Sequence, residues 1–188
     1  MLTDPIRKKD QLKNLADYWL EQGNYRNYVF IILGVLTALR VSDLLRLRWD
    51  DVYNKNIDRC YSHFTVIEEK TGKSKTIALN RRAVKALQLY YPHRHSEYLF
   101  GGSRSGNFAI SRNQAWRIMK HTVSKVPVDG NISCHSLRKT AGYHMWKAGI
   151  MPALIMDIYN HSSFEVTKRY LGIAQDERDS AYLRLKLF

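Results

Sequence analysis

The chain has 188 residues, 45% of them hydrophobic, which fits a single globular domain and argues against a disordered chain. No apolar run approaches the ~20 residues of a membrane-spanning helix, and the segment from Met1 to Asp17 lacks the apolar core of a signal peptide, so we expect a cytoplasmic protein. Thirty Lys and Arg residues against 17 Asp and Glu give a net charge of +13, which a polyanionic partner explains better than a merely basic surface does.

Helices dominate the first part of the chain. Residues 10–22 place apolar side chains at helical spacing. Residues 26–38 are nearly all apolar but too few to cross a membrane, which predicts a buried core helix. Ser42 is the candidate N-cap of a short helix that runs through Leu47. The first helix, like the last one of the chain, is expected either in the core or docked on its outside.

A β-hairpin is expected next. Residues 59–68 and 74–79 are rich in β-branched and aromatic residues and flank a turn over 69–73. Glycines and a proline mark 92–107 as a loop. The expected fold class is therefore mainly α with a small antiparallel β-sheet (α+β). The remaining helices are predicted over 81–91, 111–125, 136–148, 151–158, 163–171 and 175–185.

Two candidate site residues lie in the first half of the chain. Arg40 stands where a very apolar helix meets a capped one, so its guanidinium needs an anion, and a structural ion pair with Asp43 is the simpler interpretation. Lys70 begins the K-T-G-K turn at the tip of the hairpin. A lysine there is able to reach outward, although most lysines in such turns are merely solvated.

Two more pieces lie in the last third of the chain. His135 and Arg138 are three residues apart, so on a helix they share a face that one phosphate can touch, although such pairs are also common on surfaces. Ser162 or Ser163 can cap a helix that carries Tyr170 near its end. A lone tyrosine at such a place is usually a core or boundary residue.

The order of these pieces is more specific than any one of them. An arginine, K-T-G, H-x-x-R and H-S-S-x-x-x-T-x-x-Y-L follow one another in a basic, helix-rich chain. With the stretches TALRVSDLLRLRW, CHSLRKTAGYH and NHSSFEVTKRYL, the sequence from about Arg26 to about Leu171 resembles the catalytic domain of the tyrosine recombinase (phage integrase) family. Ala38 and Asn160 depart from the family pattern, because glycine is common at both positions.

The resemblance implies a DNA strand transferase of the tyrosine type, which integrates, excises or inverts DNA. Tyr170, as the nucleophile, would attack a DNA phosphodiester, form a 3′-phosphotyrosyl link and release a 5′-hydroxyl. That hydroxyl, or one from a partner strand, would later attack in reverse. Because the link keeps the energy of the broken bond, no cofactor and no metal are expected. Asp43 would support the site as an acidic residue. The six active-site positions of the family fall on Arg40, Lys70, His135, Arg138, His161 and Tyr170.

Each expected role follows from the chemistry of the side chain. Arg40 and Arg138 would stabilise the charge that develops on the phosphate. Lys70 is the candidate general acid for the 5′ oxygen, and His135 is the candidate proton acceptor for the nucleophile. His161 would donate a hydrogen bond to the phosphate.

The domain boundaries also follow from the resemblance. Residues 26–171 would form the catalytic core, preceded by an N-terminal helix region over 1–25 and followed by a C-terminal helix over 172–188. Relatives usually carry a separate helical domain that clamps the other face of DNA, and this chain is expected to lack it. It would be an excised catalytic domain or a compact member of the family.

Double-stranded DNA is the expected partner, held by a homotetramer on two recombination sites, with an accessory DNA-bending protein as a further partner. Asn113, Gln114 and Arg117 are the candidate base readers. A C-terminal apolar stripe would pack either on a neighbouring protomer or on its own core, and it comprises Ala181, Tyr182, Leu185 and Phe188. The candidate DNA contacts are Lys73, Arg112, Asn113, Gln114, Arg117, Lys120, Lys125 and Lys139.

Two other functions share some of these features. A topoisomerase of type IB uses the same tyrosine chemistry but relaxes supercoils without a specific site. A DNA-binding regulator that has lost catalysis would bind DNA without cutting it. Such a binder has no need of Tyr170, Lys70 and His135 together, so the complete set favours an enzyme.

Overall fold

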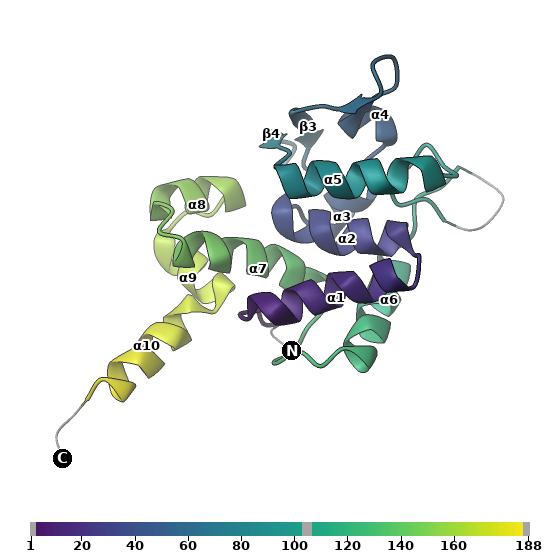
Figure 1. Cartoon of the computed structure of the whole chain (residues 1–188). Helices are drawn as coiled ribbons and strands as arrows, with labels where there is room; N and C mark the ends of the chain where they lie inside the picture. Colours follow the sequence, from purple (N-terminus) through teal and green to yellow (C-terminus); the bar gives the residue numbers. More distant parts are fainter. Residues whose placement is uncertain (1–2, 103–106, 186–188) are drawn as a thin grey trace.

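The computed structural model describes residues 3–102 and 107–185. Helices make up most of this part of the chain, and two small antiparallel sheets lie at one end of the molecule (Figure 1). The expected fold class is therefore confirmed. None of the helices in the described ranges is long and apolar enough to cross a bilayer.

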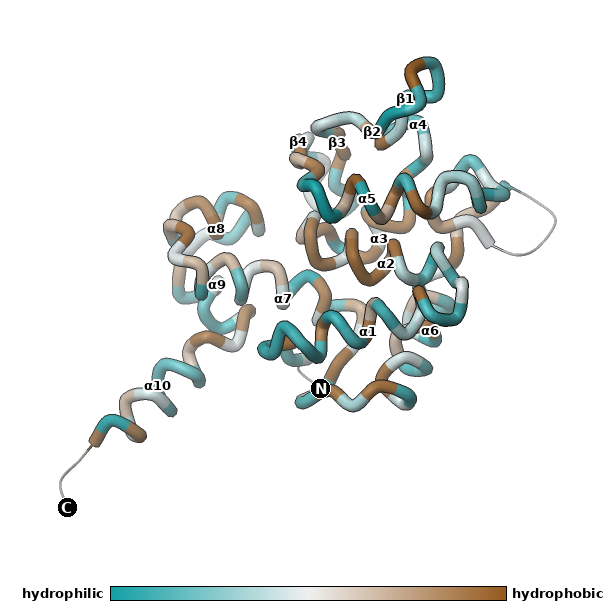
Figure 2. Tube along the Cα trace, in the orientation of Figure 1, coloured by the Kyte–Doolittle hydropathy of each residue, from teal (hydrophilic) through white to brown (hydrophobic). Residues whose placement is uncertain are grey.

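The core is built around α2 (Tyr25–Leu36), whose residues 27–35 are all buried. Asn24 caps this helix by accepting a hydrogen bond from the Asn27 backbone. The amphipathic helices α1 (Lys9–Glu21) and α5 (Arg81–Tyr90) cover it, and α7 (Cys134–Lys147) crosses beside it. Figure 2 shows α2 as a hydrophobic segment among helices of mixed hydropathy. Since α1 buries apolar side chains here, the first helix belongs to the core.

The sheet region differs from the expected single hairpin. Strands β3 (His63–Ile67) and β4 (Ser74–Ala78) pair as predicted. The start of the predicted first strand, β2 (Arg59–Cys60), pairs instead with β1 (Tyr53–Asn54). A short helix, α4 (Trp49–Val52), leads into β1 and buries its tryptophan, a feature that the sequence did not indicate.

One predicted helix cap is wrong, and the structure shows a cap that was not predicted. Helix α3 (Val41–Leu45) has Arg40 at its N-cap, so Ser42 lies inside the helix and does not cap it. Asn80 caps α5 through the backbone N–H groups of its first turn. The predicted 92–107 loop begins within a 3-10 turn, η1 (Tyr91–His93). Positions 103–106 of this loop lie outside the described residues.

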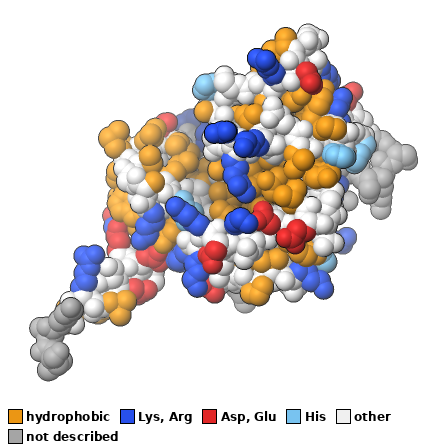
Figure 3. Space-filling model, viewed as in Figure 1, with side chains coloured by type: hydrophobic (Ala, Val, Ile, Leu, Met, Phe, Trp, Pro, Cys, Tyr) orange, Lys and Arg blue, Asp and Glu red, His pale blue; other side chains and the backbone are white. Residues whose placement is uncertain are grey.

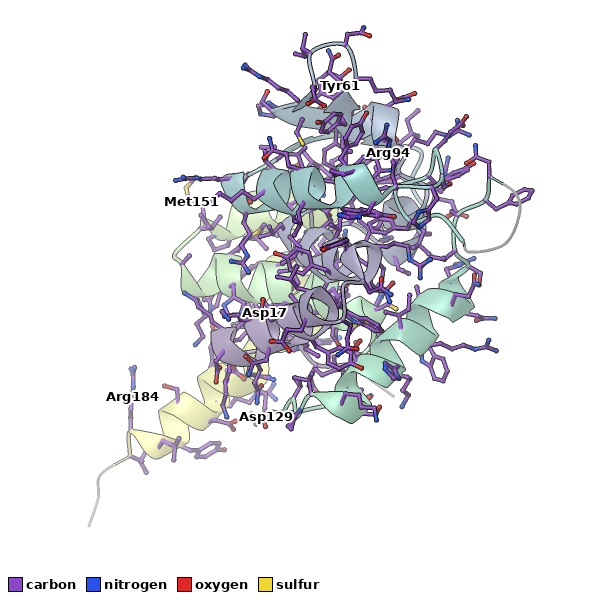
Figure 4. All side chains as sticks on the ribbon, turned by 45° about the vertical axis from the view of Figure 1, so that its right-hand side comes forward. Asp17, Tyr61, Arg94, Asp129, Met151 and Arg184 are labelled. Carbon is purple, nitrogen blue, oxygen red and sulfur yellow. The ribbon has the colours of Figure 1, made fainter. Side chains whose placement is uncertain are left out.

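The last third of the chain forms a second, smaller hydrophobic cluster beside α7. Its elements are α8 (Pro152–Tyr159), α9 (Phe164–Leu171) and the first turn of α10 (Ile173–Leu183). Helix α6 (Arg112–Lys125), which precedes α7 in the chain, begins at a Ser111 capping box. Figures 1 and 4 show α10 extending away from the rest of the molecule, with Arg184 at its far end.

Candidate active site

A break between α2 and α3 places Arg40. Ala38 has a φ of 52°, the left-handed conformation that glycine adopts most easily, which accounts for the glycine that the family pattern led us to expect there. Arg40 Nη1 lies 2.8 Å from Oε1 of the fully buried Glu68, so the guanidinium pairs with Glu68 and not with Asp43. Asp43 Oδ1 instead accepts a hydrogen bond from the Glu69 backbone at 2.9 Å, and it thereby holds the end of the hairpin.

Arg138 is buried in α7 and joins this break to the end of α8. Its guanidinium donates to the Ala38 carbonyl and, at 3.4 Å, to the Tyr159 carbonyl. Its Cζ also lies 4.5 Å from the centre of the Tyr159 ring. The last carbonyls of a helix lack partners within the helix and carry partial negative charge, so a cation at this position stabilises the end of α8.

Tyr170 lies at the centre of an aromatic cluster near the end of α9. Its ring centre is 6.1 Å from that of His135 and 5.2 Å from that of His161, both in edge-to-face arrangement. Tyr159 lies 5.7 Å away, and Lys139 Nζ is 5.2 Å from the centre of the Tyr170 ring. Residues from α7, α8 and α9 are thus gathered around one half-buried phenol.

Burial and nearby cations shift three pKa values in this cluster. Burial raises the pKa of Tyr170, and the positive charge of Arg138 opposes that rise. Burial lowers the pKa of His135 and of His161, and the positive charges of Arg138 and Arg40 lower both further. Burial and these charges therefore favour the neutral form of both imidazoles, which is the form able to accept a proton.

The loop between α8 and α9 orients His161. Asn160 ends α8 with a φ of 54°, again the conformation that favours glycine. Ser163 then caps α9 by accepting from the Val166 backbone, as one of the two predicted serines should. His161 Nδ1 lies 3.1 Å from Oγ1 of the buried Thr167, which fixes the imidazole ring against α9.

Lys70 is the candidate that the structure leaves apart from the others. It is exposed in the turn between β3 and β4 and has no hydrogen-bond or ion-pair partner anywhere in the described ranges. Its charge nevertheless contributes to the lowered pKa of His135, so the turn lies on the same side as the cluster.

Two residues of the site were missed by sequence reasoning. Glu68 is the partner of Arg40, and the only signal for it is an acidic pair next to K-T-G in a basic chain. Lys75 Nζ donates to the Ile158 carbonyl at 2.6 Å. Burial, followed by the charge of Arg138, lowers the pKa of Lys75 to about 8. A lysine in an alternating strand gives no sign of such a contact.

The candidate DNA contacts fall into two groups. Those on α6 are exposed, and Figure 3 shows basic side chains distributed over one face of the molecule rather than along one helix. The Gln114 side chain is partly used, because its Oε1 accepts from the Ser111 backbone at 2.8 Å. Lys139 does not face solvent as expected: it is buried, and its Nζ donates to the Thr3 carbonyl at 2.6 Å. The exposed group comprises Lys73 in the hairpin turn and, on α6, Arg112, Asn113, Gln114, Arg117, Lys120 and Lys125.

Relatives of known sequence share most of this chain. "Probable integrase/recombinase YoeC" of Bacillus subtilis is 35% identical over 182 residues, which cover 96% of each chain. "Tyrosine recombinase XerA" of Pyrococcus furiosus is 28% identical over 95% of this chain, which spans only 61% of that relative. "Type 1 fimbriae regulatory protein FimB" of Escherichia coli K12 is 32% identical over 77% of this chain and 72% of its own length.

Solved structures share the fold. A crystal structure of XerA recombinase superposes with a TM-score of 0.75 at 21% identity, covering 99% of this chain and 67% of that one. A lambda integrase dimer bound to a COC′ core site gives a TM-score of 0.68 at 17% identity, over 91% of this chain and 60% of that one. The sequence model of the phage integrase family matches residues 7–177, which include every candidate site residue from Arg40 to Tyr170. The chain therefore belongs to the phage integrase family, as its motifs predicted.

Proposed function

We propose that this chain is a site-specific recombinase that cleaves and rejoins DNA strands through a 3′-phosphotyrosyl link at Tyr170. One observation carries the proposal: the Tyr170 ring packs edge-to-face against the imidazoles of His135 and His161, with the buried cation Arg138 beside them. A phenol that must lose a proton as it attacks a phosphate needs both a proton acceptor and positive charge next to it. A merely structural tyrosine needs neither.

The proposed reaction balances within these residues and DNA. Tyr170 Oη forms a bond to phosphorus while the bond between phosphorus and the 5′ oxygen breaks. His135 takes the phenol proton, and Lys70 gives a proton to the departing 5′ oxygen. Arg40 and Arg138 bind the phosphate oxygens with planar, bidentate guanidinium groups. In rejoining, a 5′-hydroxyl attacks the phosphotyrosyl link and both protons return.

Lys70 reaches its place in this proposal only with DNA bound. The Lys70 side chain has no hydrogen-bond or ion-pair partner to release within the described ranges, so it is free to enter the groove beside the leaving oxygen. His161 is held by Thr167 through Nδ1, which leaves Nε2 for the phosphate. Nε2 donates to a phosphate oxygen when it carries the proton, which the negative charge of bound DNA favours.

We further propose that the partner is double-stranded DNA and that the exposed basic residues of α6 contact it. The solved structures with this fold include a lambda integrase dimer bound to a core site. The working assembly would be a homotetramer on two sites, in which α10 docks on a neighbouring protomer, with an accessory DNA-bending protein where the sites need bending. Supporting this, the end of α10 leaves Tyr182 77% and Leu183 83% exposed.

The first prediction concerns the nucleophile. Tyr170→Phe keeps the ring between the two histidines and removes only the hydroxyl, so DNA binding should persist while no covalent adduct forms. The measurement is a labelled DNA substrate run on a denaturing gel after boiling in detergent. Tyr61→Phe, on an exposed tyrosine between β2 and β3, is the matched control and should form the adduct normally.

A retained adduct in Tyr170→Phe would contradict the assignment. The same assay separates the two related activities when it includes a supercoiled plasmid that lacks any recombination site. Relaxation of that plasmid would favour a topoisomerase of type IB, and inertness on it together with cleavage of the chain's own site favours a recombinase.

A further inference from the structure

Side chains directly join the hairpin that carries Lys70 to the corner that carries His161, although the two are distant in sequence. Asn160 Nδ2 donates to Glu68 Oε2 at 2.9 Å. Lys73 Nζ donates to Asn160 Oδ1 at 3.4 Å. Both polar atoms of one amide are therefore used across the boundary between the hairpin and the α8–α9 corner.

The Glu68 carboxylate is the centre of this connection. Oε1 pairs with Arg40, while Oε2 accepts from Thr71 Oγ1 at 2.9 Å and from Asn160. Burial alone would raise the pKa of Glu68, but the hydrogen bonds from Thr71 and Arg40 hold it below its ordinary value. A fully buried carboxylate is tolerated only with such partners. One charged group thus holds the α2–α3 break, the hairpin turn and the end of α8 together.

A second contact reinforces the same boundary. The ammonium of Lys75, on β4, donates to the Ile158 carbonyl in the last turn of α8 at 2.6 Å. The hairpin therefore contacts the end of α8 both through its turn and through β4.

The identity of residue 160 matters for this connection. Its φ of 54° suits glycine, and asparagine is among the few other residues that adopt it readily. Glycine would satisfy the backbone equally well. Only a side chain with both a donor and an acceptor also bridges to Glu68 and Lys73.

We propose that Asn160 and Glu68 are positioning residues that dock the Lys70 hairpin against the corner that carries His161. This rests on the function proposed above, in which Lys70 and His161 act on the same DNA phosphate. With the connection in place, the hairpin keeps one position relative to Tyr170, and Lys70 meets the leaving oxygen without a search among many turn conformations. Without it, the turn is free to move and the proton donor is misplaced.

The docking is testable without DNA. Asn160→Gly keeps the left-handed backbone, so the variant should fold, but it removes both bridging hydrogen bonds. We expect backbone amides of residues 63–78 to exchange with deuterium faster than in the unmodified chain, as measured by mass spectrometry. Asp58→Gly is the matched control, because Asp58 has a φ of 51° in the β1–β2 turn. It should leave exchange at 63–78 unchanged. Unchanged exchange in Asn160→Gly would overturn the proposal, whatever the chain does to DNA.

The catalytic consequence is tested on DNA. We expect Asn160→Gly to slow single-turnover cleavage by about 10- to 100-fold, the loss typical of a misplaced catalytic group. A 5′-thio leaving group needs no proton, so it should restore most of this rate. In a Lys70→Ala background, Asn160→Gly should have no further effect. Equal losses on both substrates, or additive losses in the double variant, would refute the positioning role.

The two arms also separate this inference from the proposed function. If the unmodified chain forms no adduct with its DNA site, the proposed function fails. The exchange measurement still decides whether Asn160 docks the hairpin, because it requires no catalysis.

Discussion

At the scale of a single residue, His135 links the electrostatics of the site to a measurable pH dependence. Burial and the charges of Arg138 and Lys139 lower its pKa below the ordinary ~6.5, which favours the neutral form that accepts a proton. The cleavage rate at limiting DNA, which depends on the free chain, should therefore hold at neutral pH and fall in acid as His135 takes up a proton, with a midpoint below histidine's ordinary ~6.5. Single-turnover cleavage at a series of pH values measures this.

The matched variants are His135→Gln and His93→Gln, the latter on an exposed histidine of η1. Loss of His135 should lower the plateau by about 10²- to 10⁴-fold, the usual contribution of a general base, and should abolish the acid limb. His93→Gln should change neither. An acid limb that survives in His135→Gln would assign the titration to another group.

At the scale of elements, the packing of α7 on α8 and α9 sets the position of Tyr170. A Cβ added at Gly142 would lie 2.6 Å from Leu171 Cδ2 and 2.8 Å from the Tyr159 hydroxyl, so this glycine permits the close approach of the helices. Gly142→Ala should lower the free energy of unfolding by ~1–3 kcal/mol through overpacking. In an exposed helix, replacing glycine with alanine would instead raise the free energy of unfolding by ~1 kcal/mol. The sign of the change therefore shows whether the added methyl group is overpacked. Chemical denaturation measures it, with Lys147→Ala on the exposed end of α7 as the neutral control.

The helices and strands also show which structural features the sequence was able to predict. Helical periodicity predicted the major helices, and motif order predicted which family the chain belongs to, because both signals are local or linear. The predicted strand over 59–68 is divided in the structure, because Arg59–Cys60 pairs with β1 and not with β4. An alternating pattern of residues indicates a strand but does not indicate which strand it pairs with. The partner of Arg40 was missed for a similar reason: Asp43 is near in sequence, while Glu68 is near only after the hairpin folds back. Lys139 was misplaced because charge alone does not reveal burial.

At the scale of the whole molecule, α10 is held at one end and free at the other. Its first turn packs Ile173 into the second cluster, and Asp176 pairs with Arg7 at 3.0 Å. Its last turn exposes Tyr182 and Leu183, and the predicted stripe continues to Phe188, which lies outside the described residues. The structure thus joins the start of α10 to its own core and leaves its apolar end exposed, and in the proposed tetramer a second copy would cover that end.

The last prediction tests that arrangement. Because Tyr182 and Leu183 contribute little to their own fold, replacing each with serine should leave the free energy of unfolding within ~0.5 kcal/mol of the unmodified chain. The same variants should fail to assemble beyond dimers on DNA that carries two sites, since the cover between protomers would be lost. Sedimentation of the protein–DNA complex gives the stoichiometry, and Arg178→Ser on the polar side of α10 is the control. A drop in stability would place the helix end on its own core, and intact tetramers at unchanged stability would show that other surfaces hold the protomers together.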